Sequence, residues 1–199
     1  MMSQAPLFSR INITNEEINA LPLHAFDGTV NVIQDKDELP HVFKEVAKHR
    51  LVGFDTETKP VFVKGQRHLV ALMQIALPDR VFLIRIKVTG ITPDIISFLE
   101  NDKILKAGVG VRDDIKALQV LKKFTAAGFV ELADMARNAG LEVESVKKLT
   151  ALLLGFRISK SAQTSNWEAE KLDSKQISYA ATDAWVCLNI YRKLTGDLP

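Results

Sequence analysis

Two carboxylates follow a short apolar run in the segment LVGFDTET, which begins at residue 51. On a strand, Asp55 and Glu57 would lie on one face with their Cα atoms roughly 6–7 Å apart. Carboxylates held this close repel each other unless a cation lies between or beside them, and Mg²⁺ and Mn²⁺ prefer such oxygen ligands. The alternative is that the two acids simply end the strand and face water.

A second candidate group lies in the segment YAATD, residues 179–183. Tyr179 and Asp183 are four residues apart, so they share one face of the helix that this segment predicts. The small residues around them either let the helix pack closely against a sheet or leave room for a ligand. The other reading is a half-buried tyrosine beside a surface aspartate. The apolar residues of the same helix argue against it, because an unpaired carboxylate among them is costly.

A third candidate is the segment KAGVGVRDDIKAL, residues 106–118, where a strand leads through a glycine turn into a helix. The glycines lack the Lys-Ser/Thr pair of a phosphate-binding loop and are weak evidence for one. The helix begins near Asp113 and Asp114. Acids at a helix start are favoured by the helix dipole, which explains one of these aspartates better than both.

The elements that must position these side chains alternate between strands and helices from Thr29 onward. We expect strands at 29–33, 51–57, 68–77, 80–86 and 103–110, and helices at 37–49, 92–101, 113–124, 131–140, 145–155 and 173–194. This order predicts an α/β fold with a mixed sheet, antiparallel early in the chain and flanked by helices. Residues 29–199 are expected to form one domain. Residues 1–28 would be an N-terminal arm with a short helix that Asn15 or Thr14 caps and Pro22 ends.

Composition narrows the classes of function. The net charge of the 199 residues is only +2, so charge alone does not indicate a nucleic-acid binder. We find no apolar run of about 18 residues and no apolar signal sequence, so we expect no membrane partner and a cytoplasmic location. The single cysteine, Cys187, fits a reducing compartment and is expected in the core. Four basic residues follow the first two acids closely: Lys59, Lys64, Arg67 and His68. They either belong to a solvated loop or, if the acids form a site, lie where they would meet an anionic substrate.

The order FDTE, GVGVRDDIKAL, YAATD resembles the DEDD (DnaQ-like) superfamily of 3′–5′ exonucleases. The tyrosine four residues before the last aspartate marks the DEDDy branch, to which ribonuclease D and the exonuclease domain of the Werner syndrome helicase belong. The likeness covers roughly residues 29–195 and includes the segment 145–167. It implies a ribonuclease H-like fold, in which three antiparallel strands are followed by parallel ones. In this family an apolar residue follows the second-motif aspartate by four positions. That register selects Asp114, which precedes Leu118, over Asp113, which precedes Ala117.

The resemblance implies metal-dependent hydrolysis of phosphodiester bonds at single-stranded or recessed 3′ ends. Two divalent cations, Mg²⁺ or Mn²⁺, would lie about 3.5–4 Å apart. Their expected ligands are Asp55, Glu57, Asp114 and Asp183. Tyr179 would orient the attacking water as a neutral phenol, because its ordinary pKa is near 10.

Further substrate contacts follow from the same resemblance. The backbone of Thr56 would meet the terminal 3′ hydroxyl, Val61 would lie between the last two bases, and Lys160 would neutralise a phosphate. Val61 could equally be an ordinary loop or core residue. Trp167 could stack on a base, although a buried core position is the preferred interpretation.

Two rival functions remain at this stage. The first is a module that holds nucleic-acid ends or protein partners with little turnover, which the intact acids disfavour. The second is another metal-dependent phosphohydrolase acting on small phosphoesters, which the segment 145–167 disfavours. The matched residues include neither the helical nucleic-acid domain of ribonuclease D nor a helicase. We therefore expect either action on short or frayed ends, or a protein partner that supplies substrate affinity.

Overall fold

A mixed sheet forms the centre of the computed structural model, which describes residues 8–63 and 65–197. Within these residues the strand order is β1-β4-β3-β2-β5-β6. Strands β2, β3 and β4 are antiparallel neighbours, whereas β1 pairs parallel with β4, and β5 and β6 extend the other edge in parallel. This confirms the predicted α/β fold with an antiparallel portion followed by parallel strands. The bounds are β1 Thr29–Ile33, β2 Leu51–Thr58, β3 Val70–Ala76, β4 Arg80–Ile84, β5 Leu105–Gly108 and β6 Phe129–Glu131.

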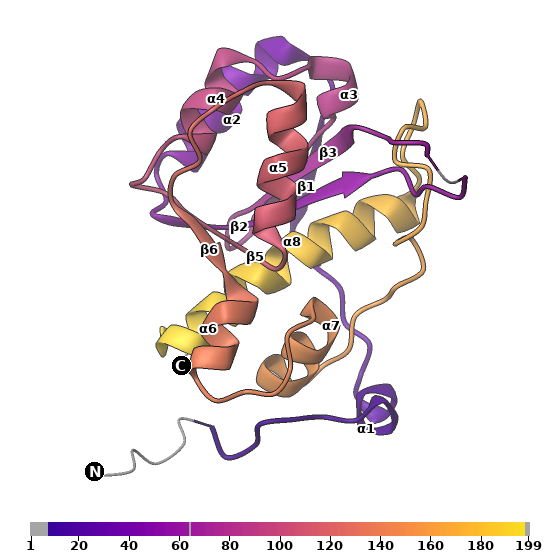
Figure 1. The fold of residues 1–199 in the computed structure, drawn as a ribbon, viewed down its shortest axis with the longest axis vertical. Coiled ribbons are helices and arrows are strands. Elements are labelled where there is room, and N and C mark those ends of the chain that lie inside the picture. Colours follow the sequence, from indigo (N-terminus) through magenta and orange to yellow (C-terminus); the bar gives the residue numbers. More distant parts are fainter. Residues whose placement is uncertain (1–7, 64, 198–199) are drawn as a thin grey trace.

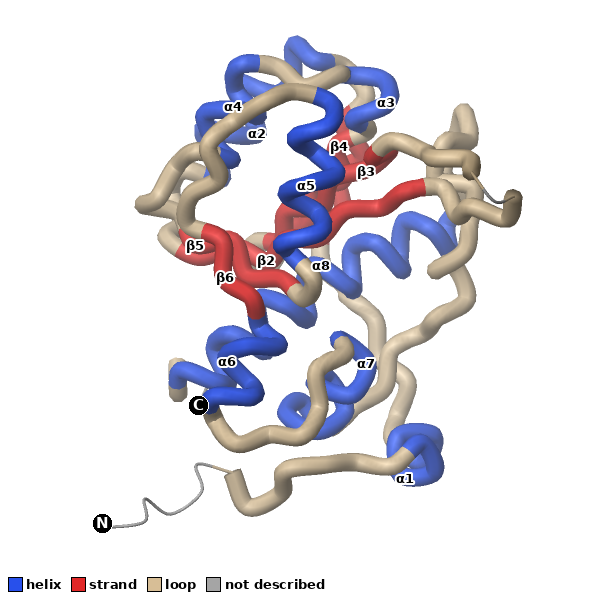
Figure 2. Tube along the Cα trace, in the orientation of Figure 1, coloured by secondary structure: helices blue, strands red, loops and turns tan. Residues whose placement is uncertain are grey.

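Helices cover both faces of the sheet (Figures 1 and 2). The helices α2, α4 and α5 lie on one side, and the long helix α8 crosses the other, with α6 and α7 beside it. Side chains alternate along β2 between these two layers. Phe54 packs in the core under α2 and α4, while Gly53 faces α8. The helices are α1 Asn15–Ala20, α2 Leu39–Val46, α3 Ile86–Thr89, α4 Pro93–Leu99, α5 Val111–Leu121, α6 Leu132–Asn138, α7 Val146–Leu149 and α8 Ser174–Thr195.

Helix caps follow the sequence signals closely. Thr14, rather than Asn15, caps α1 through a capping box with Glu17. Asp173 caps α8 in the same way with Gln176. The described part of the arm packs on the domain, because the backbone amide of Phe26 donates to Thr182 Oγ1 at 3.1 Å.

Several predicted boundaries differ from the structure. The strand expected at 80–86 ends at Ile84, and α3 follows it at once. The strand β6 was not predicted, and it precedes α6, which ends at Asn138. The helix expected at 145–155 is one α-helical turn followed by a π-helical segment, Thr150–Leu154, which ends at Gly155 in the left-handed conformation.

The remaining expectations concern Cys187, membrane-spanning helices and the basic cluster after β2. Cys187 is 1% exposed, which confirms it as a core residue. None of the helices in the described residues has the length and apolar character needed to cross a membrane. Lys64, part of the predicted basic cluster, lies outside the described residues.

Candidate active site

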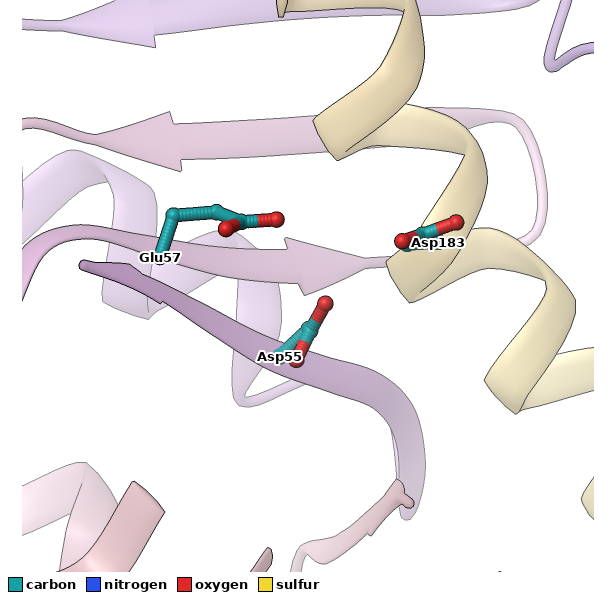
Figure 3. A group of neighbouring side chains, drawn as sticks. All are labelled: Asp55, Glu57 and Asp183. Atoms are coloured by element: carbon teal, nitrogen blue, oxygen red, sulfur yellow. The ribbon is translucent and has the colours of Figure 1, made fainter. Parts of the chain in front are cut away.

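Three carboxylates meet between β2 and α8. Asp55, Glu57 and Asp183 each offer a carboxylate oxygen, and these oxygens all lie within 4.8 Å of one another. Figure 3 shows the side chains of Asp55 and Glu57 rising from one face of β2, with Asp183 beside them on the helix. The structure therefore brings together two of the three sequence segments, and Asp55 and Glu57 share one face of β2 as the strand periodicity predicted.

Close packing of α8 on the sheet makes this meeting possible. A Cβ added to Gly53 would lie 1.9 Å from the carbonyl oxygen of Ala184, the residue that follows Asp183. The helix presents Ala180, Ala181 and Ala184 to the sheet, and all three are fully buried. Of the two readings of these small residues, close packing is the one that the structure shows.

The third segment reaches the site through Asp114. The strand β5 ends at Gly108, and Gly110, with φ +80°, turns the chain into α5. Asp114, in the first turn of this helix, accepts a hydrogen bond from Thr56 Oγ1 at 2.6 Å. The side chain of Asp113 is 87% exposed and pairs with Lys116 at 2.9 Å. The structure thus places Asp114, and not Asp113, beside β2, although Asp114 lies outside the group of three.

Burial raises the pKa values of all four carboxyls, and for Asp55 and Glu57 the charges of the other carboxylates raise them further. The pKa of Asp55 rises well above its ordinary value through burial and through the charges of Asp114, Glu57 and Asp183. Burial, and then Asp183 and Asp114, raise the pKa of Glu57 to about 9. Burial raises the pKa of Asp114 and that of Asp183 to about 6. The cluster therefore holds protons at neutral pH unless a cation compensates its charge.

The donor set fits a hard divalent cation. It consists of carboxylate oxygens, the ligands that Mg²⁺ and Mn²⁺ prefer. Asp183 Oδ1 is buried and has no hydrogen-bond partner among the described residues. A buried, unpartnered carboxylate oxygen is costly, and cation binding would remove both this cost and the repulsion.

Asp55, Glu57 and Asp183, but not Asp114, line a cavity of about 400 Å³. Tyr179, Lys147 and Lys160 belong to the same lining. Burial, and then the charge of Asp183, raise the pKa of Tyr179 further above its ordinary value, so its hydroxyl stays neutral. A cavity of this size that joins acids, lysines and a phenol suits a phosphate-containing ligand held through cations.

Residues 30–199 match the family described as 3′–5′ exonuclease. The chain belongs to this family. It is 32% identical over 190 residues to the bifunctional 3′–5′ exonuclease/ATP-dependent helicase WRN of Mus musculus, covering 89% of this chain but only 13% of that protein. This exonuclease-family chain thus spans a small part of that relative's length.

Solved structures agree with the family assignment. The Nibbler EXO domain of Aedes aegypti is 26% identical, with a TM-score of 0.76 over 88% of this chain and 92% of that one. Ribonuclease D of Escherichia coli shares the fold at 20% identity, with a TM-score of 0.77 over 85% of this chain and 45% of that one. The sheet of this exonuclease-family chain is therefore ribonuclease H-like.

Of the three predicted substrate-binding residues of this exonuclease-family chain, two line the cavity and one does not. Thr56 and Lys160 line the cavity with Asp55, Glu57 and Asp183. Val61 does not; it lies beyond the end of β2 and is 47% exposed. Trp167 is fully buried and packs on the ring of Tyr179 at a centroid distance of 6.0 Å, so the core interpretation of this tryptophan is confirmed.

Lys147 is a cavity residue that sequence reasoning missed. It follows the cap of α7 and has Lys148 beside it, a pattern typical of a solvated helix face. The available signal was the family likeness of the segment 145–167, which contains both Lys147 and Lys160.

Proposed function

We propose that this chain hydrolyses phosphodiester bonds at nucleic-acid 3′ ends, as a 3′–5′ exonuclease that uses two divalent cations, Mg²⁺ or Mn²⁺. The observation that carries the proposal is the convergence of Asp55, Glu57 and Asp183 within 4.8 Å, with Asp114 held beside them by Thr56. Membership of the 3′–5′ exonuclease family supports the same reaction.

Each carboxylate has a place in this proposal. Asp55, Glu57 and Asp183 would hold one cation, and Asp55 and Asp114 the other. Bound cations of this kind lower the pKa of water and stabilise a leaving oxygen. Tyr179 would donate or accept a hydrogen bond that orients the attacking water. Its raised pKa makes it unsuited to act as a base.

The substrate would enter the cavity as the terminal nucleotide of a single-stranded or recessed 3′ end. A volume of about 400 Å³ lies in the range of small-molecule sites. Lys160 and Lys147 would meet the phosphate, the backbone of Thr56 the 3′ hydroxyl, and Val61 the last two bases. A structural neighbour supports a nucleic-acid substrate, since ribonuclease D of Trypanosoma brucei was crystallised in complex with RNA U12.

Two further expectations belong to this proposal. With a net charge of only +2, the chain carries little surplus positive charge for phosphate contacts, so it would either act alone on short or frayed ends or depend on a protein partner for substrate affinity. A cytoplasmic location stays a prediction, drawn from the single free cysteine.

The test is a time course on 5′-labelled oligonucleotides, single-stranded and 3′-recessed, as DNA and as RNA. Each would be incubated with Mg²⁺, with Mn²⁺ or with a chelator. We expect a ladder that shortens from the 3′ end only when metal is present. Asp55→Asn should lower the rate by about a hundredfold or more, because it removes a central ligand. Asp113→Asn, which changes an exposed neighbouring acid, is the matched control and should retain the rate.

Two results would contradict the proposal. An unchanged rate in Asp55→Asn would remove the metal assignment. Tight oligonucleotide binding by the unmodified protein, without shortening in either metal, would favour the module that binds ends with little turnover.

A further inference from the structure

An exposed apolar surface follows β2 directly. The segment 59–69 joins β2 to β3, and Phe62 within it is 81% exposed. No other large hydrophobic side chain in the described residues is as exposed, the next being Val120 at 72%. Val61, Val63 and Leu69 of the same segment are also about half exposed. A cluster of this kind on a surface indicates a contact with another molecule.

Cations accompany the exposed ring. Lys59, Phe62 and Arg67 line one surface hollow of about 570 Å³. Neither Lys59 nor Arg67 forms an ion pair with any described residue. His68 at the base of the segment pairs with Glu168 at 3.3 Å, and Lys87 takes the other oxygen of Glu168 at 3.4 Å. The hollow therefore keeps two cations without a direct ion-pair partner among the described residues beside an exposed aromatic ring, although the charge of Lys59 also acts on Glu168.

The hollow is continuous with the candidate active site along the chain. Lys59 lies two residues after Glu57, and Phe62 lies five residues after it, so the Cα atoms of Glu57 and Phe62 are at most roughly 18 Å apart. The contact between His68 and Glu168 ties this segment to the chain that leads into α8, and the two run side by side beyond the end of β2 (Figure 1). A strand held by its 3′ end in the catalytic cavity would meet this surface within its first few nucleotides.

We propose that Phe62, Lys59 and Arg67 bind the nucleotides on the 5′ side of the scissile bond, with a base stacked on the ring and phosphates near the cations. An exposed aromatic ring beside cations is the chemistry that recognises single-stranded nucleic acid, because every base has a face to stack and every nucleotide a phosphate. An apolar protein segment would gain from Phe62 but not from two unpaired cations. The proposal rests on the proposed function, since it places the 3′ end in the acidic cavity.

An abasic scan tests the stacking. Fluorescence anisotropy in chelator would give the affinity for 5′-labelled single-stranded 12-mers, each lacking one base between the second and sixth nucleotides from the 3′ end. We expect one abasic position to weaken binding to the unmodified protein by roughly tenfold. The Phe62→Ala protein should bind the intact 12-mer more weakly by the same factor. Removing the base at that position should then cause no further loss of affinity. Phe62→Tyr keeps the ring and should restore the affinity, while Val120→Ala is the exposed apolar control.

The salt dependence tests the cation. Arg67→Gln should reduce the slope of log affinity against log salt concentration by about 0.7, the value for one phosphate contact on a single strand. Lys123→Gln, which removes an exposed cation elsewhere, should leave the slope unchanged.

The outcomes separate the two proposals. Hydrolysis by the unmodified protein, with 12-mer affinity unchanged in Phe62→Ala, would overturn this inference alone and leave a protein segment as the occupant. An abasic effect that persists in Phe62→Ala would also overturn it. Absence of both binding and hydrolysis with every oligonucleotide would overturn the proposed function itself.

Discussion

Gly53 of β2 and Ala184 of α8 lie so close together that no side chain fits at position 53. A Cβ on Gly53 would lie 1.9 Å from the Ala184 carbonyl oxygen and 3.1 Å from the backbone nitrogen of Leu188. Asp183 precedes Ala184, and Asp55 lies two residues beyond Gly53. The missing side chain at position 53 therefore sets the spacing between the two elements that carry the proposed metal ligands.

Gly53→Ala should consequently affect both stability and activity. The added methyl would force α8 away from β2, and overpacking of this kind costs about 1–3 kcal/mol of unfolding free energy. The same displacement would separate Asp183 from Asp55, so the rate per folded molecule should fall by at least about tenfold. Urea denaturation and the 3′-shortening assay, at a temperature where the variant is folded, measure the two effects.

Gly140→Ala is the control variant, because it should destabilise the protein without changing the spacing between β2 and α8. Gly140 has φ +84°, and a Cβ there would meet nothing within 4 Å. Backbone strain alone should cost about 1–2 kcal/mol and leave the rate per folded molecule unchanged. If both glycine variants lost activity in proportion to their stability, the spacing argument would be wrong.

The hydrogen bond from Thr56 to Asp114 supports a second prediction. Thr56→Val keeps the shape and the backbone of residue 56 but removes the donor that holds Asp114 Oδ1 at 2.6 Å. We expect the hydrolysis rate to fall by about tenfold and the concentration of Mg²⁺ needed for half-maximal rate to rise, because oriented ligands bind metal better. Thr56→Ser retains the hydroxyl and should restore both quantities. An unchanged metal requirement in Thr56→Val would count against a ligand role for Asp114.

The raised carboxyl pKa values predict how the stability of the metal-free protein depends on pH. Between pH 4 and the folded-state pKa values, the unfolded chain loses protons that the folded chain retains, so the unfolding free energy falls as pH rises. A carboxyl whose pKa rises from 3.8 to about 6, as in Asp183, contributes a loss of about 3 kcal/mol. Glu57, with a pKa of about 9, extends the loss to alkaline pH.

Urea midpoints in chelator should therefore decrease from pH 5 to pH 9. Millimolar Mg²⁺ should flatten this dependence, because a cation replaces the protons in the cluster. Asp55→Asn removes one of the repelling charges and should flatten the dependence without metal. A chelated protein more stable at pH 9 than at pH 5 would contradict the assigned cluster.

The sequence predicted the parts of the site that depend on local periodicity. The two-residue repeat of a strand placed Asp55 and Glu57 on one face, and the helical repeat placed Tyr179 with Asp183. Whether Asp113 or Asp114 turns toward β2 depends on where α5 begins. Periodicity left that open, and only the resemblance selected a register. The convergence of three segments from distant positions rests on tertiary packing, which the resemblance supplied and periodicity did not.

Sequence analysis missed features that depend on contacts between residues far apart in the chain. The strand β6 has three residues, too few for a pattern, and exists because Lys106–Gly108 of β5 pairs with it. Lys106 is fully buried, although a hydrophobic pattern predicts an exposed position for a charged residue. Its ammonium donates to the carbonyls of Asn101, Ile104 and Ala127 at 2.6–2.9 Å, and the third of these partners is 21 residues away. A run such as RVFLIRI likewise gives no sign that the strand ends before Arg85.

Tyr179 can be tested apart from the metal ligands. Its ring packs on Trp167, and Tyr179→Phe keeps that contact while removing the hydroxyl. We expect the turnover number to fall by roughly tenfold to a hundredfold, with unfolding free energy and Mn²⁺ affinity close to those of the unmodified protein.

Because the pKa of Tyr179 lies above its ordinary value, the phenol stays neutral, and the rate of the unmodified protein should show no inflection near pH 10. Rate profiles from pH 6 to pH 10.5 and calorimetric Mn²⁺ titrations of both proteins measure these quantities. Tyr179→Phe with full turnover, or an inflection near pH 10 that the variant lacks, would remove the water-orienting role of a neutral tyrosine.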